Sequence, residues 1–369
     1  MKIIFLFSSF LLIVLLGPLA SLACETTRET PSKSLKIEHY LDRFSQIIGL
    51  NGNVLITKDD TVVLSKSYGY ADLASKIPLS KDSQFCIGSV TKQFTAIAIL
   101  RLVQDSKLSL SDPIRKLIPD FKDAPWAEDV SVEHLLSHTS GIFEPNHIQK
   151  KVAPSFKSID QIIDYLKNKP SISKPGDLFL YSNTGYIVLG YLIEKITSQP
   201  LDLYLHGTFF APLEMHSTSL QTLHQPYECQ KQEQTATLVS PHQYKDSGII
   251  APIEKIYCDI PYAAGGLIST TGDLTKWNRG LYGGEIISNS LLERFLSPHH
   301  LGYGLGITVE TYADTSVIYK HGGAIDGYHS LLLYLPKQKV SICVLTNVDY
   351  NSPHRMEALM DNLSMMMVG

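Results

Sequence analysis

The chain has 369 residues, of which 44% are hydrophobic and 18% are charged, and its formal net charge is −4. This length suits one large domain, or a domain with a substantial inserted lobe. The nearly balanced charge and the lack of basic runs argue against a nucleic-acid partner.

Residues 1–23 have the features of a secretory signal peptide. Lys2 is followed by an apolar stretch over residues 3–16, which approaches the length of a membrane-spanning helix. A break at Pro18 and small residues before Cys24 favour a cleaved signal over an anchor. Cys24 could itself carry a lipid anchor. In either case we expect an exported protein, periplasmic or attached to the cell envelope.

The five cysteines of an exported chain raise the question of disulfides. Cys86 and Cys343 lie in apolar runs, so we expect both to be buried free thiols. Cys229 and Cys258 flank a polar segment and are the best candidates for a pair. The sequence does not determine the pairing.

After a polar linker over residues 24–34, strands are predicted near both ends of a domain that covers residues 35–369. A helical segment is followed by a hairpin of two strands. Three strand-like runs and a last helix end the chain, and residues 107–257 are mostly helix and loop. The predicted segments are helix 35–48, strands 53–57, 61–70, 317–321, 328–335 and 340–346, and a helix from residue 353.

The helix predicted over residues 89–104 is apolar nearly all round and should be buried. Lys92 lies one turn after Ser89 on the same face. Because lysine is rarely buried without a partner or a purpose, a desolvated neutral Lys92 could take the hydroxyl proton of Ser89 and create a nucleophile. An ordinary serine at a helix N-terminus explains the pair equally well. A second Ser-x-x-Lys at residues 171–174 lies in a predicted loop, and we interpret it as chance.

His134 and His138 are four residues apart and could share a metal ion. No carboxylate or third ligand follows at a suitable spacing, so we expect structural histidines and no metal site.

Tyr181 and Asn183 lie in a short extended run and would point to the same side of it. A phenol beside a cationic lysine can have a lowered pKa. The amide of Asn183 can both donate and accept, which suits it to orient a lysine and a substrate. Alone, an aromatic packing residue and a turn asparagine would explain the two.

Four residues, His321, Gly322, Gly323 and Ala324, close the first of the late strands. Paired glycines there let a second backbone or a ligand come close to the strand.

Together these segments resemble the serine β-lactamase and penicillin-binding-protein superfamily. The likeness is to class C β-lactamases, D-alanyl-D-alanine carboxypeptidases and related esterases, and it runs from about residue 35 to the C-terminus. Three elements occur in the order found in that superfamily, Ser89-x-x-Lys92, Tyr181-Ser182-Asn183 and His321-Gly322-Gly323. The flanking residues 85–95, 135–141, 175–190 and 264–273 also look like family signatures.

The resemblance implies an α/β (α+β) fold. Its antiparallel sheet would be built from both chain ends, about residues 35–95 and 258–369, and flanked by helices. A mostly helical lobe, about residues 96–257, would be inserted, with the site between the two parts.

The resemblance also implies a role for each site residue. Ser89 would form an acyl-enzyme, and Lys92 and Tyr181 would move protons. The N–H groups of Ser89 and of Ala324, beside Gly323, would form an oxyanion hole, and Asn183 would hold the substrate. We expect no metal or organic cofactor, and a small-molecule or peptide substrate that bears an acyl group.

His321 departs from the pattern, because many members of the superfamily have a lysine there that helps to bind a substrate carboxylate, although some DD-peptidases and uncharacterised relatives carry histidine. The histidine favours a peptidase, esterase or amidase over a strong β-lactamase. With an unperturbed pKa of about 6.5, His321 would be partly cationic at neutral pH and could bind a substrate carboxylate. A non-catalytic cell-wall peptide or antibiotic sensor of the same fold is the main alternative function. A metallo-hydrolase is disfavoured, since the chain has no His-x-His-x-Asp cluster.

Overall fold

A computed structural model of the chain describes residues 32–142, 144, 158–221, 238–244, 250–253, 262–312, 316–350 and 353–368. The predicted signal peptide, Cys24 and the candidate pair Cys229 and Cys258 lie outside these residues. Among the helices of the described part, none is both long and apolar enough to cross a membrane.

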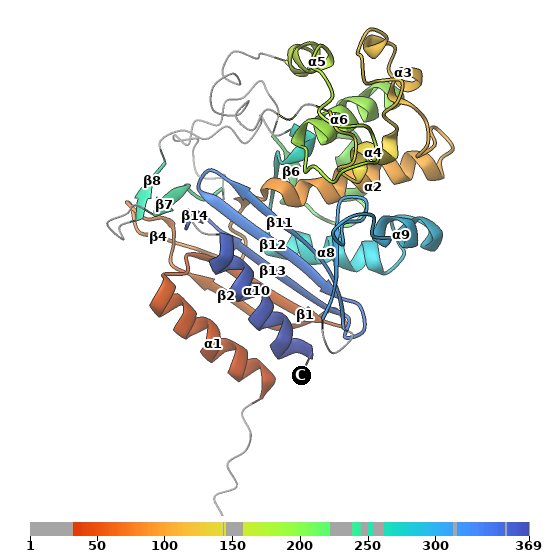
Figure 1. Cartoon of the computed structure of the whole chain (residues 1–369). Coiled ribbons are helices and arrows are strands. Elements are labelled where there is room, and N and C mark those ends of the chain that lie inside the picture. Colours follow the sequence, from red (N-terminus) through yellow and green to blue (C-terminus); the bar gives the residue numbers. More distant parts are fainter. Residues whose placement is uncertain are drawn as a thin grey trace, which may run out of the picture.

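The centre of the fold is a six-stranded antiparallel sheet made from both ends of the chain, as predicted (Figure 1). The N-terminal hairpin joins the C-terminal strands because β1 pairs with β13, with Gly52 opposite Thr346 and Lys58 opposite Val340. The spatial order is β10-β11-β12-β13-β1-β2. The strands are β1 (Gly52–Lys58), β2 (Thr61–Tyr68), β10 (Thr308–Thr311), β11 (Val317–Ile325), β12 (Tyr328–Leu335) and β13 (Val340–Thr346).

Alternate side chains of the central strands enter two separate apolar cores. In β13, Ile342 and Val344 pack in the core with α1 (Lys33–Ile48) and α10 (Pro353–Val368). Cys343 and Leu345, between and after them, pack in the larger core with the other helices. Figure 1 shows α1 and α10 together on one side of the sheet. With both faces covered, these strands appear in the sequence as nearly continuous apolar runs.

The larger core is built around α2 (Thr91–Gln104), which is buried nearly all round, as predicted. Phe94 of α2 stacks on Trp277 of α8 (Thr271–Tyr282), with ring centroids 4.0 Å apart. α8 packs on the sheet beside β1 and β13, and α6 (Asn183–Thr197) packs against α2. A helix held on all sides keeps its polar side chains in fixed positions, which is what a catalytic residue on it needs.

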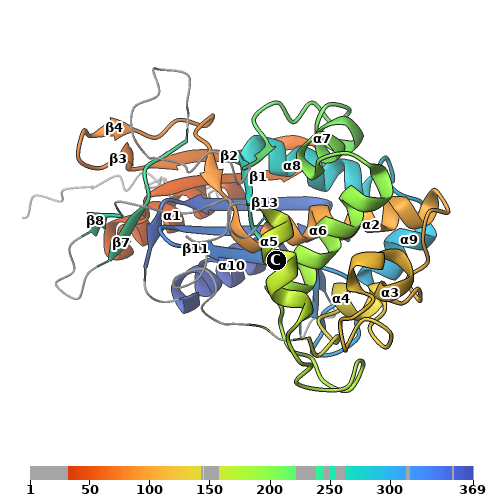
Figure 2. The same cartoon turned by 90° about the horizontal axis from the view of Figure 1, so that it is seen from above.

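The middle of the chain is mostly helical in its described part, and Figure 2 shows its helices gathered beside one end of the sheet. Part of the predicted lobe departs from this pattern, because β7 pairs with β14 next to the sheet and β8 pairs with β7. The remaining elements are α3 (Ile114–Leu117), α4 (Val132–Leu136), α5 (Ile159–Lys167), α6 (Asn183–Thr197), α7 (Leu201–Leu205), α9 (Asn289–Leu296), β3 (Tyr70–Asp72), β4 (Ile77–Pro78), β5 (Phe85–Cys86), β6 (Ser219–Leu220), β7 (His242–Tyr244), β8 (Ile250–Pro252), β9 (Leu267–Ser269) and β14 (Val348–Asp349).

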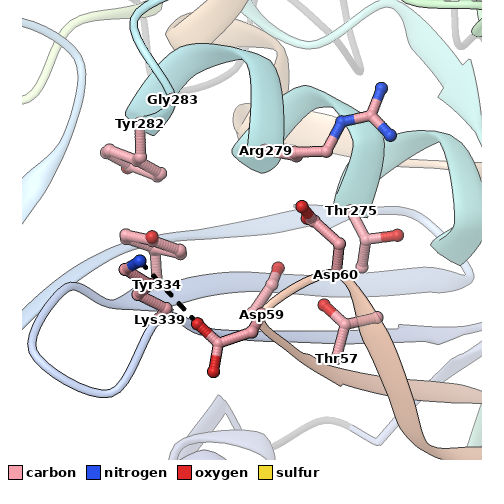
Figure 3. Close-up of a pocket in the computed structure, with 10 residues that line it drawn as sticks. Thr57, Asp59, Asp60, Thr275, Arg279, Tyr282, Gly283, Tyr334 and Lys339 are labelled. Atoms are coloured by element: carbon pink, nitrogen blue, oxygen red, sulfur yellow. Dashed lines mark ion pairs between the residues drawn. The ribbon is translucent and has the colours of Figure 1, made fainter.

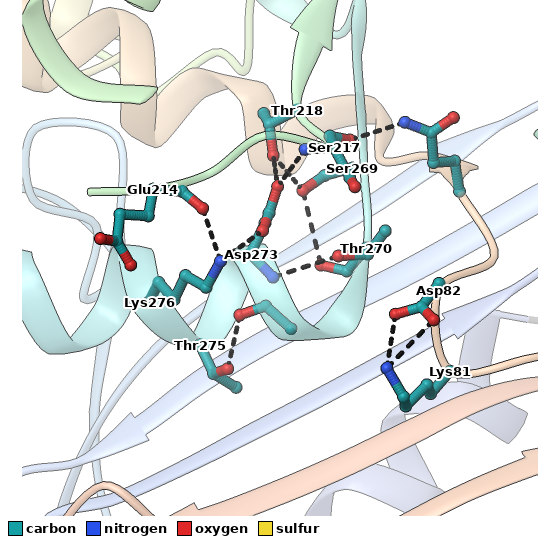
Figure 4. Close-up of polar contacts among 12 residues, drawn as sticks. Lys81, Asp82, Glu214, Ser217, Thr218, Ser269, Thr270, Asp273, Thr275 and Lys276 are labelled. Carbon is teal, nitrogen blue, oxygen red and sulfur yellow. Dashed lines mark hydrogen bonds and ion pairs between the residues drawn. The ribbon is translucent and has the colours of Figure 1, made fainter. Parts of the chain in front are cut away.

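Asp273, in the first turn of α8, fixes the short β5-β9-β6 sheet (Figure 4). The serine turn, which is the 3-10 turn Gly88–Val90 that contains Ser89, follows β5. Oδ2 of Asp273 accepts hydrogen bonds from the backbone N–H of Ser217 at 2.8 Å and from Oγ1 of Thr218 at 2.9 Å. Its Oδ1 lies 3.2 Å from Nζ of Lys276. Asp273, part of a quoted family signature, therefore has a structural role here.

Of the two cysteines in the described residues, one is in the predicted state and the other is not. Cys343 is buried and free, as expected. Cys86, expected to be a free thiol, is disulfide-bonded, and its partner lies outside the described residues. The apolar run around Cys86 could not reveal this, because a thiol and a disulfide are both weakly polar and both suit a buried site.

Candidate active site

Ser89 and Lys92 lie in consecutive turns at the start of the buried helix. Ser89 is in the 3-10 turn Gly88–Val90, and Lys92 is in the first turn of α2, with its Nζ 3.0 Å from Oγ of Ser89. The side chain of Lys92 is 0% exposed. Burial lowers the pKa of Lys92 to about 7, although the charge of Glu144 acts in the opposite direction. The sequence predicted this lowered pKa.

Two more oxygens surround the amine of Lys92. Oδ1 of Asn183 lies 2.8 Å from Nζ, and the carbonyl oxygen of Ala264 lies 2.7 Å from it. Both oxygens can only accept, so a neutral amine gives them its two N–H bonds. The lone pair of the amine then faces the hydroxyl of Ser89, which is the orientation that a general base requires.

The phenol of Tyr181 completes this group. Its hydroxyl shares a hydrogen bond with Ser89, and its ring centroid lies 4.9 Å from Nζ of Lys92. Tyr181 is 41% exposed as a whole residue, but its hydroxyl lies within the site. Burial there raises its pKa above the usual value, and the bond with Ser89 offsets only part of that rise. The predicted lowering of the Tyr181 pKa is therefore wrong, because burial of the hydroxyl outweighs its hydrogen bond with Ser89.

The Tyr181 segment is the start of a helix rather than a strand. α6 begins at Asn183, and Oγ of Ser182 caps it by accepting from the N–H of Gly185 at 3.0 Å. Tyr181 and Asn183 nevertheless both reach Lys92. Oε2 of Glu144 accepts from Oγ of Ser182 at 2.9 Å and from the N–H of Thr184 at 2.8 Å. Glu144 therefore holds the position of the helix start.

Two glycines bring the backbone of β11 against the serine turn. A Cβ on Gly323 would lie 2.0 Å from the carbonyl oxygen of Ile87 and 2.9 Å from the backbone N of Ser89. A Cβ on Gly88, whose φ is +48°, would lie 3.0 Å from the backbone N of Ala324. The N–H groups predicted to form the oxyanion hole thus come from adjoining backbone segments that only glycine allows to approach so closely.

His321 lies in β11, and both of its ring nitrogens are occupied. Its Nε2 is 3.0 Å from the hydroxyl of Tyr303, and its Nδ1 is 2.7 Å from the carbonyl oxygen of Gly322. Burial, together with the charge of Lys92, lowers its pKa to about 4. The prediction that His321 is partly cationic at neutral pH is therefore wrong, and its ring is neutral.

The family model described as Beta-lactamase matches residues 37–363. The chain belongs to the β-lactamase family. It is 26% identical over 331 residues to penicillin-binding protein 4* of Bacillus subtilis (strain 168), which covers 84% of this chain and 70% of that protein. It is 29% identical over 339 residues to Protein flp of Staphylococcus aureus (strain N315), covering 88% of this chain and 65% of that protein. It thus spans less than two thirds of Protein flp.

Solved structures support the same fold. D-amino acid amidase from Ochrobactrum anthropi SV3, solved with L-phenylalanine amide, matches with a TM-score of 0.74 and 23% identity. The match covers 91% of this β-lactamase family member and 97% of the amidase.

The two histidines near α4 have different partners. Nδ1 of His134 accepts from the N–H of Ser131 at 3.2 Å, which caps α4 as a structural histidine would. His138 is fully buried next to the site, with its ring centroid 4.2 Å from that of Tyr181. Within the described residues, no group of three or more metal-ligating side chains is found. The second Ser-x-x-Lys, at residues 171–174, lies in a loop.

A pocket of about 370 Å³ lies away from these residues, between the β1–β2 turn and the C-terminal end of α8 (Figure 3). Lys339 and Asp59 form an ion pair on its rim at 3.9 Å. Its lining residues are Thr57, Asp59, Asp60, Thr275, Arg279, Tyr282, Gly283, Tyr334, Lys339 and Ser341, and none of them is a predicted site residue.

Proposed function

We propose that this chain is an exported serine hydrolase that forms an acyl-enzyme on Ser89 with an ester, amide or β-lactam carbonyl. One observation supports this most directly. The buried amine of Lys92 lies within hydrogen-bond distance of two carbonyl-type acceptors and 3.0 Å from Oγ of Ser89, which leaves the lone pair of the neutral amine for that hydroxyl. A lysine whose pKa is lowered to about 7 and whose Nζ lies 3.0 Å from a serine hydroxyl has both the position and the basicity of a general base.

Acylation in this proposal begins when Oγ of Ser89 attacks the substrate carbonyl and its proton passes to Nζ of Lys92. The backbone N–H groups of Ser89 and Ala324 stabilise the oxyanion. The neutral phenol of Tyr181 gives its proton to the leaving group as the carbonyl–leaving-group bond breaks. Lys92 then returns a proton to the phenolate, and the acyl-enzyme remains on Ser89.

Deacylation uses the same groups in reverse. Water replaces the departed group at the acyl carbonyl and loses a proton to the same base system as its oxygen attacks. The tetrahedral species collapses, Oγ of Ser89 leaves, and Lys92 returns the proton to it. Whether this second half is fast decides between a turnover enzyme and a slowly deacylating binding protein.

We also propose that the chain is exported. The apolar N-terminal segment supports export, and so does the disulfide at Cys86, because disulfides persist mainly in oxidising compartments. N-terminal sequencing of the mature protein after expression in a bacterial host tests this. Cleavage after Ala23 is expected, and a mature protein that retains Met1 in the cytoplasm would refute it.

Covalent labelling tests the hydrolase. Mass spectrometry after exposure to a fluorophosphonate should show a single adduct on Ser89, absent from Ser89→Ala. Ser171→Ala, in the second Ser-x-x-Lys, is the matched control and should label like the wild type. A panel of p-nitrophenyl esters, nitrocefin and D-Ala-D-Ala peptides then gives the acyl class. An adduct that turns over supports the enzyme, a permanent penicillin adduct supports a binding protein, and no adduct refutes both.

A further inference from the structure

A buried chain of hydrogen bonds connects the segment after Tyr181 to the strand that carries His321. The N–H of Ser182 lies 3.0 Å from Nδ1 of His138, and Nε2 of His138 lies 3.2 Å from the hydroxyl of Tyr303. The same hydroxyl lies 3.0 Å from Nε2 of His321. His138, Tyr303 and His321 are all buried. Tyr303 belongs to none of the sequence motifs, and the sequence predicts only a structural role for His138.

The two ends of this hydrogen-bond network determine which ring nitrogen of each imidazole carries the proton. The N–H of Ser182 can only donate, so Nδ1 of a neutral His138 accepts and its Nε2 carries the proton. At the other end the carbonyl of Gly322 can only accept, so Nδ1 of His321 carries the proton and its Nε2 accepts. The hydroxyl of Tyr303 then accepts from His138 and donates to His321. It shares that donation with the hydroxyl of Tyr186, which itself donates to the carbonyl oxygen of Leu136 at 2.8 Å. Burial lowers the pKa of both imidazoles, and the neutral ring is the form that this pattern needs.

Two further observations indicate that His138 is held in place for this purpose. Its backbone φ is +57°, a left-handed conformation that is uncommon for a residue other than glycine. Its ring also packs against Tyr181, with centroids 4.2 Å apart at an interplanar angle of 35°. His138 therefore contacts the phenol of the site directly and reaches His321 through one hydroxyl.

The hydrogen bonds of His321 limit the interactions that its ring can make with a substrate. Its only N–H bond is directed at Gly322, and its remaining lone pair accepts from Tyr303. The charge of Lys92 further lowers the pKa of His321 and so disfavours a second proton on the ring. His321 thus presents a substrate with neither a positive charge nor a free N–H donor.

We propose that His138 and Tyr303 are positioning residues that hold His321 in its neutral Nδ1–H tautomer, and that the site therefore prefers acyl donors whose leaving group carries no carboxylate. This inference rests on the proposed function, since it names the substrate class of the same acyl-transfer site. In this proposal His321 does not bind a substrate carboxylate, contrary to the expectation from the sequence.

The tautomers can be measured without any turnover. In the full chain labelled with ¹⁵N-histidine, two-bond ¹H–¹⁵N correlation spectra at pH 7 report which ring nitrogen carries the proton. His321 should be Nδ1–H and His138 Nε2–H, with signals assigned by their loss in His321→Gln and His138→Gln. An Nε2–H tautomer or an imidazolium at His321 would overturn the proposal.

Kinetics test the substrate class. The probes are two esters. Hippuryl-phenyllactate has a leaving group that carries a carboxylate, and in the second ester that carboxylate is converted to a primary carboxamide, which is neutral. The wild type should favour the neutral ester at least tenfold in kcat/KM at pH 7. In Tyr303→Phe the Nε2 of His321 loses its donor and becomes free to take a proton. The preference should then shift toward the carboxylate ester at least tenfold at pH 5.5, mainly through KM.

Tyr312→Phe is the matched control, because the Tyr312 hydroxyl donates to Asp361 of α10 at 3.0 Å and takes no part in the hydrogen bonds between His138 and His321. It should leave the substrate preference unchanged. A wild type that prefers the carboxylate ester, or an unchanged preference in a folded Tyr303→Phe, would refute the inference. If neither ester is hydrolysed and Ser89 takes no label, the proposed function fails, while the tautomer measurement still decides the state of His321.

Discussion

The carbonyl oxygen of Ala264 lies 2.7 Å from Nζ of Lys92, although the two residues are 172 positions apart in the sequence. Ala264 ends a short 3-10 turn that precedes β9, and β9 pairs with β5 just before the serine turn. A backbone carbonyl cannot rotate away as a side chain can. The Ala264 carbonyl therefore fixes one N–H of the amine and leaves the lone pair for Ser89.

Acylation should accelerate as pH rises through about 7, the pKa to which burial lowers Lys92. Only the neutral amine can take the proton from Ser89, so kcat/KM for a neutral p-nitrophenyl ester should be low at pH 5.5 and reach a plateau above pH 8. His321 does not contribute to this limb, since its pKa lies near 4. A pH–rate profile that is flat between pH 6 and 8 would exclude Lys92 as the titrating base.

Lys92→Met should abolish acylation and also stabilise the fold. Methionine has a similar length, and the buried charge is removed at neutral pH, which we expect to be worth roughly 1–3 kcal/mol. The folded pKa of about 7 lies below that of the unfolded chain, so the unfolded state binds more protons between about pH 7 and 10.5 and wild-type stability rises over that range. The advantage of the variant should therefore be largest at pH 7 and below, and shrink toward pH 10. Urea titrations at pH 6 and pH 9.5 measure the difference, and an equal or growing advantage at pH 9.5 would contradict the assignment.

Much of the fold was predictable from the sequence because both faces of the sheet are covered. The late strands are apolar runs bounded by turns, and their bounds 328–335 and 340–346 match β12 and β13. β11 was predicted too short, since it continues through its glycines to Ile325. The glycines were interpreted as a strand end, which is wrong. The close backbone approach predicted for them is confirmed, because β11 meets the serine turn there.

The parts of the site that consist of side chains in motifs were predictable from the sequence. The parts that depend on a backbone carbonyl or on the burial of a side chain were not. Ser89, Lys92 and Asn183 form the predicted group. The carbonyl of Ala264 could not be found, because any residue type has one. The sign of the pKa shift at Tyr181 depends on burial of its hydroxyl, which spacing does not reveal. Tyr303 lies far from every motif in sequence, and only the fold brings it to His321.

Tyr181→Phe should slow turnover far more than it weakens the fold. The ring and its packing against His138 remain, and the residue is 41% exposed, so stability should change by less than about 1 kcal/mol. Loss of the proton donor should lower kcat by roughly 10²- to 10⁴-fold. Tyr70→Phe is the control, since Tyr70 is 39% exposed and belongs to β3, outside the site. If Tyr181→Phe keeps full activity on esters and amides, Lys92 moves all the protons alone.

Gly323→Ala should damage the site, whereas Gly322→Ala should be nearly silent. The added methyl at residue 323 would lie 2.0 Å from the carbonyl oxygen of Ile87 and 2.4 Å from Oγ of Ser330, so β11 must move away from the serine turn. The same methyl at residue 322 meets only Cδ2 of Leu331 at 3.4 Å and the carbonyl oxygen of Ser330 at 3.8 Å, ordinary contact distances.

The expected cost at residue 323 has two parts. Displacing one oxyanion donor should lower kcat by about 10²- to 10³-fold, and the steric overlap should cost about 1–3 kcal/mol of stability. Activity is therefore measured well below the melting temperature of the variant, and folded protein is counted by the fraction that a fluorophosphonate labels after long exposure. Near-normal kcat in a folded Gly323→Ala, or equal losses in Gly322→Ala, would mean that the close approach of β11 to Ser89 does not form the oxyanion hole.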